Sequence, residues 1–116
     1  MMRDLNLRTL AAIVAGLVLT SSVAAAVSAE KGKAAYVRHG CWQCHGFDGQ
    51  GSVAGSKIAP NPMPFEAFSD FVRTTSGAMP PYQKAILSDD DLADIYAYLQ
   101  SVPKARDPKT IPLLNP

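Results

Sequence analysis

The sequence predicts an all-α domain, and three observations support this fold class. Apolar residues recur with helical spacing in residues 64–74 and again in residues 88–102. Residues 46–63, by contrast, are rich in Gly and Pro and predict a long loop. No segment shows the two-residue alternation of polar and apolar side chains that is typical of a β-strand.

The first 29 residues have the pattern of a secretory signal peptide. Arg3 and Arg8 precede an apolar run over residues 10–19, and the small residues of Val27-Ser28-Ala29 predict cleavage after Ala29. An uncleaved membrane anchor is the alternative, because residues 10–29 are nearly long enough to span a bilayer. The polar residues at positions 20–22 favour cleavage. We therefore expect an exported, periplasmic chain, bound to a membrane only if the leader is retained.

The remaining 87 residues, 30–116, are sufficient for one domain with a small core. They contain nine Lys and Arg and nine Asp and Glu, so their net charge is near zero. This balance argues against a nucleic-acid-binding protein, which would carry a basic patch. We assign residues 30–103 to the domain and residues 104–116 to a Pro-containing tail. The tail is expected to lie on its own domain, with the binding of a partner as the alternative.

The sequence predicts two helices before residue 75. Residues 30–40 form the first, and Gly32 lies one turn before Tyr36, either at a close helix contact or in a frayed end. Residues 64–74 form the second, with Pro64 in its first turn. Its apolar stripe comprises Phe65, Phe68, Phe71 and Val72. Such a stripe is explained equally well by ordinary core packing and by contact with a bound cofactor.

The third predicted helix begins after Ser88, which is a favourable N-cap residue. Asp91 stands at the capping-box position, and the acidic run that contains it suits the positive end of a helix dipole. A cation site is the alternative interpretation of this run. Pro103 ends the helix.

Residues 41–45 read Cys-Trp-Gln-Cys-His, which is the attachment motif of a c-type haem. Cys41 and Cys44 would form the two thioether bonds to one haem, and His45 would bind the iron. A thioredoxin-like pair needs a βαβ context that the sequence lacks. A structural zinc site needs four ligands, and His39 lies too close to the motif to complete one easily. A plain disulfide or a chance match remains as the simplest alternative.

The candidates for a second iron ligand are Met79, Met63 and His39. Met79 lies in a loop that two following prolines, Pro80 and Pro81, stiffen. Met63 is also flanked by prolines and competes with Met79, unless it only fills space in the core. His39 stands two residues before Cys41 and would have to cross the ring, so we interpret it as a surface histidine.

Together these segments resemble the class I cytochromes c of bacteria. The resemblance spans residues 30–103 and rests on residues 41–46 with the glycines after them, on Ala78-Met79-Pro80-Pro81-Tyr82, and on residues 87–99. It implies a cytochrome c fold of three to five short helices around one covalent haem c. It also implies that Met79 is the distal ligand. The first and last helices would cross, with Gly32 and Tyr36 against Ile95 and Tyr98.

The chain departs from this family's pattern at two places. Many members have Gly-Pro in the loop after the haem motif, where a backbone carbonyl fixes the proximal imidazole. Here the corresponding residues are Gly55-Ser56-Lys57, so the carbonyl of Ser56 is the candidate partner of His45. Tyr36 also stands five residues before Cys41, one more than the family pattern implies.

The function expected from these residues is one-electron transfer rather than catalysis. With His45 and Met79 both bound, the iron would have no open position for a substrate. The protein would be a free carrier or the electron-accepting subunit of a dehydrogenase, with a redox protein on the dehydrogenase or the terminal oxidase or reductase side as its partner. A haem sensor or enzyme with a labile distal ligand is the alternative. The haem edge is expected near Trp42, Gln43 and the Met79 loop.

Overall fold

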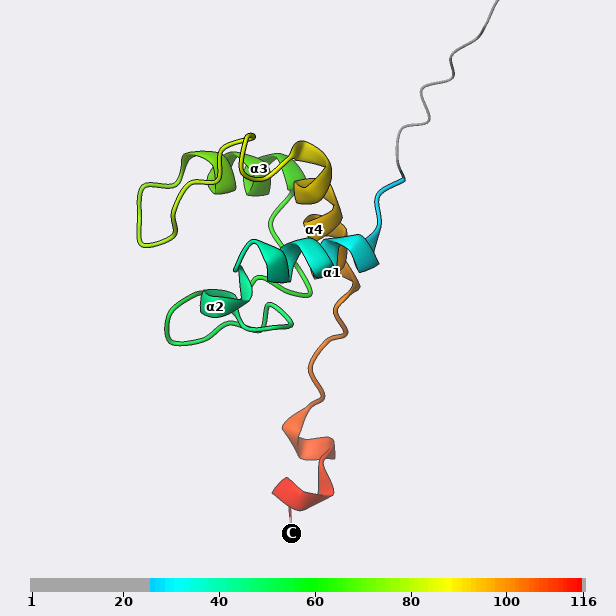
Figure 1. Ribbon diagram of the computed structural model, residues 1–116. Coiled ribbons are helices and arrows are strands. Elements are labelled where there is room, and N and C mark those ends of the chain that lie inside the picture. Colours follow the sequence, from blue (N-terminus) through cyan, green and yellow to red (C-terminus); the bar gives the residue numbers. More distant parts are fainter. Residues whose placement is uncertain (1–25, 116) are drawn as a thin grey trace, which may run out of the picture.

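The structure is a computed structural model that describes residues 26–115. Within this range it contains four α-helices and two 3-10 turns and no strand, which confirms the all-α fold (Figure 1). Most of the predicted leader, residues 1–25, lies outside the described residues. None of the helices in the described part of the chain has the length and apolar character needed to cross a membrane.

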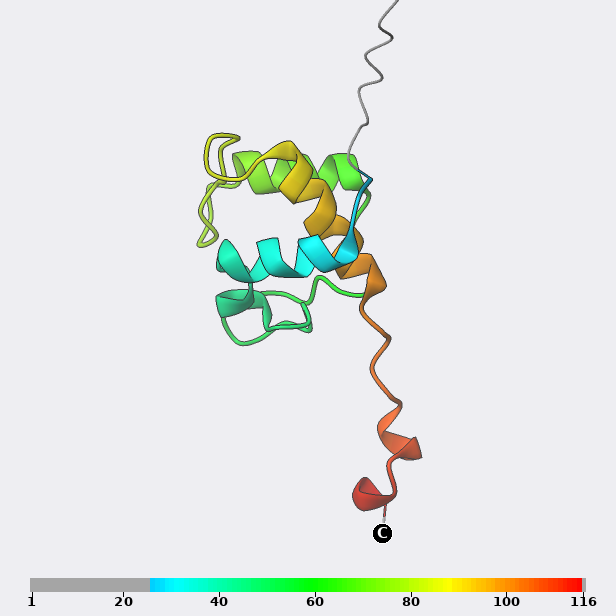
Figure 2. The ribbon, with the colours of Figure 1, turned by 45° about the vertical axis from the view of Figure 1, so that its right-hand side comes forward.

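Helices α1 (Ala29–Arg38) and α4 (Asp89–Ser101) cross at the centre of the fold (Figure 2). Gly32 lies at the crossing, where an added Cβ would overlap the backbone carbonyl of Asp94. The rings of Tyr36 and Tyr98 pack beside it with 5.4 Å between their centroids. The predicted contact between the first and last helices is thereby confirmed, and Gly32 is there because only a residue without a side chain allows this approach.

The N-terminus of α1 lies one residue earlier than predicted and is tied to α4. The Ser28 side chain caps the helix by accepting a hydrogen bond from the Lys31 N–H at 3.3 Å. The Ser28 N–H donates to Oδ1 of Asp94 at 2.6 Å, and Asp94 is buried with 9% of its surface exposed. Residues on the leader side of the predicted cleavage point after Ala29 therefore belong to the packed domain.

The third main helix, α3 (Phe65–Thr74), packs against α4 through aromatic side chains. The ring centroids of Phe65 and Phe68 lie 5.1 and 5.4 Å from that of Tyr96. Pro64 precedes the helix as its N-cap residue instead of lying in the first turn. Its extended backbone, with ψ of 143°, lets the chain enter the helix directly from the Pro-rich loop.

At α4, Ser88 caps the helix as predicted, its side chain accepting from the Asp91 N–H at 3.1 Å. The Asp91 carboxylate does not complete a capping box and instead accepts from Arg38 at 3.0 Å. The acidic run is thus a helix start, and the carboxylates of Asp89 and Asp91 pair with neighbouring cations. A fourth helix, α2 (Trp42–His45), is a single turn that was not predicted as a separate element.

The expectation that the tail lies on its own domain is wrong. After α4 the chain runs away from the helices and ends in two short 3-10 turns, η1 (Pro108–Thr110) and η2 (Pro112–Leu114) (Figures 1 and 2). These turns are held by their own polar groups, since the Asn115 side chain donates to the carbonyls of Pro108 and Ile111 at 2.8 and 3.0 Å. Leu113 and Leu114 are 92% and 62% exposed, so neither side chain packs on the domain.

Candidate cofactor site

A cavity of about 310 Å³ lies between the motif segment, α3, α4 and the loop that carries Met79. Its walls are mostly apolar, and several of them are core side chains: Phe68, Val72, Leu92, Ile95 and Leu99. Within the apolar stripe of α3, Phe68 and Val72 belong to the core and also line the cavity, so core packing is confirmed for them and contact with a cofactor stays a prediction. Phe71 lines it too, while 49% of its surface is exposed.

Both cysteines line this cavity, Cys41 as the N-cap residue of α2 and Cys44 within its single turn. The His45 N–H donates to the Cys41 carbonyl at 3.0 Å, which closes the turn. Because residues three apart share one face of a helical turn, the two thiols can reach the same edge of one flat ligand. Both thiols are free in the structure, Cys41 half-buried and Cys44 exposed. Burial raises the pKa of the Cys41 thiol to about 11, so this thiol is protonated at neutral pH.

The imidazole of His45 also lines the cavity, and a hydrogen bond at its Nδ1 atom fixes the orientation of the ring. Nδ1 lies 2.7 Å from the carbonyl oxygen of Ser56. The donor of this hydrogen bond must be Nδ1, since a carbonyl oxygen only accepts, and the lone pair of a neutral ring is then on Nε2. The structure thus confirms Ser56 as the partner of His45 without the usual proline. Gly55 allows it, because a Cβ there would lie 2.7 Å from the Cys44 carbonyl.

Two tyrosines hold the chain that follows the motif, a role that sequence reasoning missed. The buried Tyr36 donates from its hydroxyl to the Gly46 carbonyl at 2.8 Å. Tyr98 donates to the Phe47 carbonyl at 2.7 Å. Burial raises the pKa of both hydroxyls, so they act as neutral donors. A buried Tyr needs a partner for its hydroxyl, and this requirement was the available signal.

Both methionine candidates line the cavity. Met79 is partly buried and packs against the core, whereas Met63 is 47% exposed. His39 is not among the lining residues, and its interpretation as a surface histidine is wrong. Its side chain is only 13% exposed, and Nε2 lies 3.6 Å from Oδ2 of Asp91. The end of α1 turns this residue towards the start of α4, which the local sequence does not reveal.

These residues fit a covalently attached haem. The cavity offers apolar walls to a flat macrocycle, two thiols at one edge, an oriented imidazole, and thioether groups from two methionines. Imidazole with a thioether is a ligand pair found in cytochromes c. The exposed aromatic residue Phe47 stacks on Trp42 of the motif, with the ring centroids 4.6 Å apart.

The chain is similar to one family of known proteins. A family model described as cytochrome c oxidase, cbb3-type, subunit III matches residues 27–99. The match begins just before the Ser28 cap of α1 and ends in α4, so it covers the whole cavity and leaves out the tail. The comparisons with curated proteins and with solved structures found no match.

Proposed function

The chain belongs to the c-type cytochrome family described as subunit III of cbb3-type cytochrome c oxidase, and we propose that it is a one-electron carrier with haem c attached at Cys41 and Cys44. Membership in this family implies haem c binding and haem-based electron transfer. The observation that carries the proposal is the position of the motif. Both thiols and an imidazole oriented by Ser56 border one apolar cavity.

In this proposal His45 is the proximal iron ligand and Met79 the distal one. The bound haem supplies an iron that alternates between the ferric and ferrous states. The chain supplies the ligands, holds His45 by the Ser56 carbonyl, and keeps water from the ring through its apolar walls. The deeper packing of Met79 favours it over Met63.

We further propose that the protein works outside the cytoplasm after removal of its leader, as c-type cytochrome domains typically do. Family membership implies a redox-complex partner of some kind. That partner is a dehydrogenase, from which this chain accepts electrons as a subunit, or a terminal oxidase or reductase, to which this chain delivers electrons as a free carrier. The stacked pair Trp42 and Phe47, close to the thiols in sequence, supports a docking face at this end of the molecule.

Haem attachment is tested on the exported protein by extraction with acidified acetone, followed by mass spectrometry. One haem should remain bound per chain, and neither cysteine should react with a thiol reagent. Cys41→Ser and Cys44→Ser should each lose one thioether bond. Gln43→Ala is the matched control, because it changes the motif between the cysteines and leaves both thiols in place. Complete extraction of haem from the unchanged protein would refute the proposal.

Reversible one-electron transfer is tested by redox titration of the same protein. A single haem should follow a one-electron titration curve, and the reduced protein should bind carbon monoxide only slowly under native conditions, because bound Met79 would have to leave the iron first. Rapid binding of carbon monoxide would favour the alternative of a sensor or an enzyme with a labile ligand.

A further inference from the structure

Met79 lies in a loop, residues 75–82, whose far end is anchored at Tyr82. The Tyr82 N–H donates to the Val72 carbonyl on α3 at 2.9 Å. Its hydroxyl donates to the His39 carbonyl at the end of α1 at 3.0 Å. Tyr82 thus connects the loop to two helices, and it stands only three residues after Met79.

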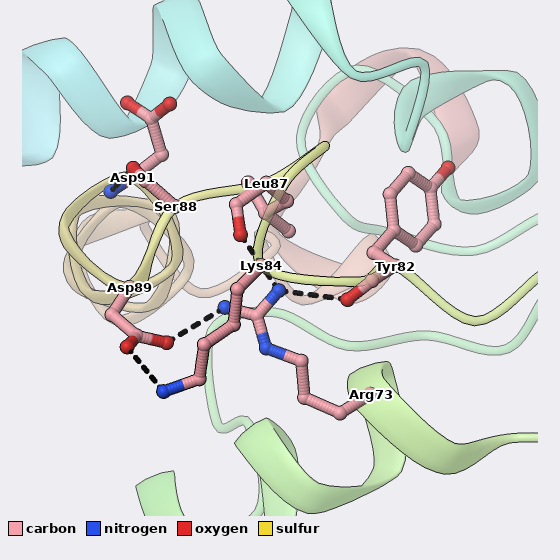
Figure 3. Close-up of polar contacts among 7 residues, drawn as sticks. All are labelled: Arg73, Tyr82, Lys84, Leu87, Ser88, Asp89 and Asp91. Carbon is pink, nitrogen blue, oxygen red and sulfur yellow. Dashed lines mark hydrogen bonds and ion pairs between the residues drawn. The ribbon is translucent and has the colours of Figure 1, made fainter.

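The remaining polar group of this anchor, the Tyr82 carbonyl, is bound by Arg73 (Figure 3). Nη1 of Arg73 donates to the carbonyls of Tyr82 and Leu87, both at 2.7 Å. Nη2 donates to Oδ1 of Asp89 at 2.9 Å. Arg73 therefore links the last turn of α3 to both ends of the segment from Tyr82 to Leu87 and to the first residue of α4.

The guanidinium group of Arg73 is largely buried. Only 14% of the Arg73 side chain is exposed, and its Nε is buried with no hydrogen-bond partner within residues 26–115. A charge that is removed from water must be compensated by polar contacts, and here two backbone carbonyls and one carboxylate supply them. The hydrogen bond from Lys84, together with that from Arg73, holds the pKa of Asp89 below its ordinary value, so the carboxylate is ionised.

Lys84 provides a natural comparison, because it binds the same carboxylate and donates no hydrogen bond to the Tyr82 carbonyl. Its Nζ donates to Oδ2 of Asp89 at 2.7 Å, and 74% of its side chain is exposed. In Figure 3 Lys84 approaches Asp89 alone, whereas Arg73 also reaches the two carbonyls. The planar fork of an arginine can hold several acceptors in fixed directions, which the single ammonium group of a lysine does not reproduce.

We propose that Arg73 is a positioning residue for the distal ligand: its bonds to the Tyr82 and Leu87 carbonyls hold the Met79 loop in the conformation that presents the thioether to the iron. This inference rests on the proposed role of Met79. Without the guanidinium, the Tyr82 carbonyl loses its partner, and the loop leaves the ligating conformation more often. The consequence is a larger population of protein in which the second axial position is open.

The test compares Arg73→Gln, Arg73→Lys and the control Lys84→Gln in the haem-loaded protein under conditions where all are folded. The readouts are the sulfur-to-iron charge-transfer band of the ferric form and the rate of carbon monoxide binding to the ferrous form. Losing one charge-assisted hydrogen bond changes an equilibrium at least about tenfold, so Arg73→Gln should bind carbon monoxide at least about tenfold faster. Arg73→Lys should fall between it and the unchanged protein, and Lys84→Gln should match the unchanged protein.

Four outcomes decide between these possibilities. An unchanged band and an unchanged rate in Arg73→Gln would overturn the positioning role, and so would equal effects of Arg73→Gln and Lys84→Gln. If Arg73→Gln does not fold, the same criteria apply to Arg73→Lys, whose full retention of the band and rate overturns the proposal. A missing charge-transfer band in the unchanged protein would instead refute Met79 as the ligand, which separates a failure of the proposed function from a failure of this inference.

Discussion

At the scale of single residues, the site depends on backbone groups as much as on side chains. The imidazole of His45 takes its orientation from the Ser56 carbonyl, and the last residue of the Met79 loop, Tyr82, accepts a hydrogen bond from Arg73 through its backbone carbonyl. A carbonyl is present at every residue, so the identity of Ser56 does not itself reveal this role. The residue type matters at the neighbouring position 55, because a side chain on Gly55 would place its Cβ against the Cys44 carbonyl.

Met79→Ala and Met63→Ala separate the two candidates for the distal ligand. Met79→Ala should remove the ferric sulfur-to-iron band, open the sixth position and lower the reduction potential, because Met ligation raises it. Met63→Ala should leave the band unchanged and cost less than the roughly 2–4 kcal/mol of a buried Met, since Met63 is 47% exposed. Absorption spectra and redox titration provide the measurements. The opposite pattern would assign the ligand to Met63.

At the scale of elements, the crossing of α1 and α4 is the most extensive contact between helices in the described part of the chain. Gly32→Ala places a Cβ against the Asp94 carbonyl, so the two helices must move apart. Overpacking of this kind typically costs about 1–3 kcal/mol, and Gly32→Val should cost more than Gly32→Ala. Denaturant unfolding of the haem-loaded protein measures the loss.

Gly77→Ala is the matched control for this substitution. Nothing lies within 4 Å of the Cβ that it adds. It should therefore leave the free energy of unfolding unchanged or raise it slightly through the unfolded state. Equal losses for Gly32→Ala and Gly77→Ala would show that the helix crossing is not the cause.

The contacts at the start of α1 predict that the position of leader cleavage affects the stability of the folded protein. A chain that starts at Glu30, as cleavage after Ala29 would produce, lacks both the Ser28 cap and the N–H that binds Asp94. It should be less stable than a chain that starts at Val27 by about 0.5–2 kcal/mol for the cap alone. Ser28→Ala in the longer chain removes only the side-chain cap and should be intermediate. Equal stabilities would show that these contacts contribute nothing.

At the scale of the whole molecule, the tail is separate from the domain. Deleting residues 104–116 should change the free energy of unfolding by no more than about 0.5 kcal/mol, because the deletion removes exposed residues that bond to one another. Thermal unfolding of the full and shortened haem-loaded proteins measures the difference. A large loss would show that the tail packs on the domain in solution.

The charge balance of residues 30–116 predicts how the protein meets a redox partner. Nine basic and nine acidic residues leave little net charge for long-range attraction. Docking should therefore rely on a local, partly apolar face around Trp42 and Phe47, and stopped-flow rates with a physiological partner should depend only weakly on ionic strength. A steep fall in rate with added salt would instead indicate a charged docking face, with Lys57, Lys84 or the Asp89–Asp91 cluster as its centre.

By itself, the sequence determined the helical fold class, the order of the three main helices and the residues of the attachment motif. These features have local signatures: helical spacing, the Ser88 cap and the close spacing of Cys41, Cys44 and His45. Each of them depends on residues within about one or two helical turns of one another, a distance over which chain geometry determines which side chains share a face.

Only the tertiary structure decided what those elements contact. It brought the Ser56 carbonyl to His45, turned His39 towards Asp91, bonded the largely buried Arg73 to the Tyr82 carbonyl and left the tail away from the domain. The physical reason is that each of these outcomes depends on groups that are distant in sequence or on contacts that do not form. Every residue has a backbone carbonyl, so the sequence does not indicate which carbonyl will accept a hydrogen bond from a distant side chain. The sequence also does not indicate how much space a neighbouring helix leaves.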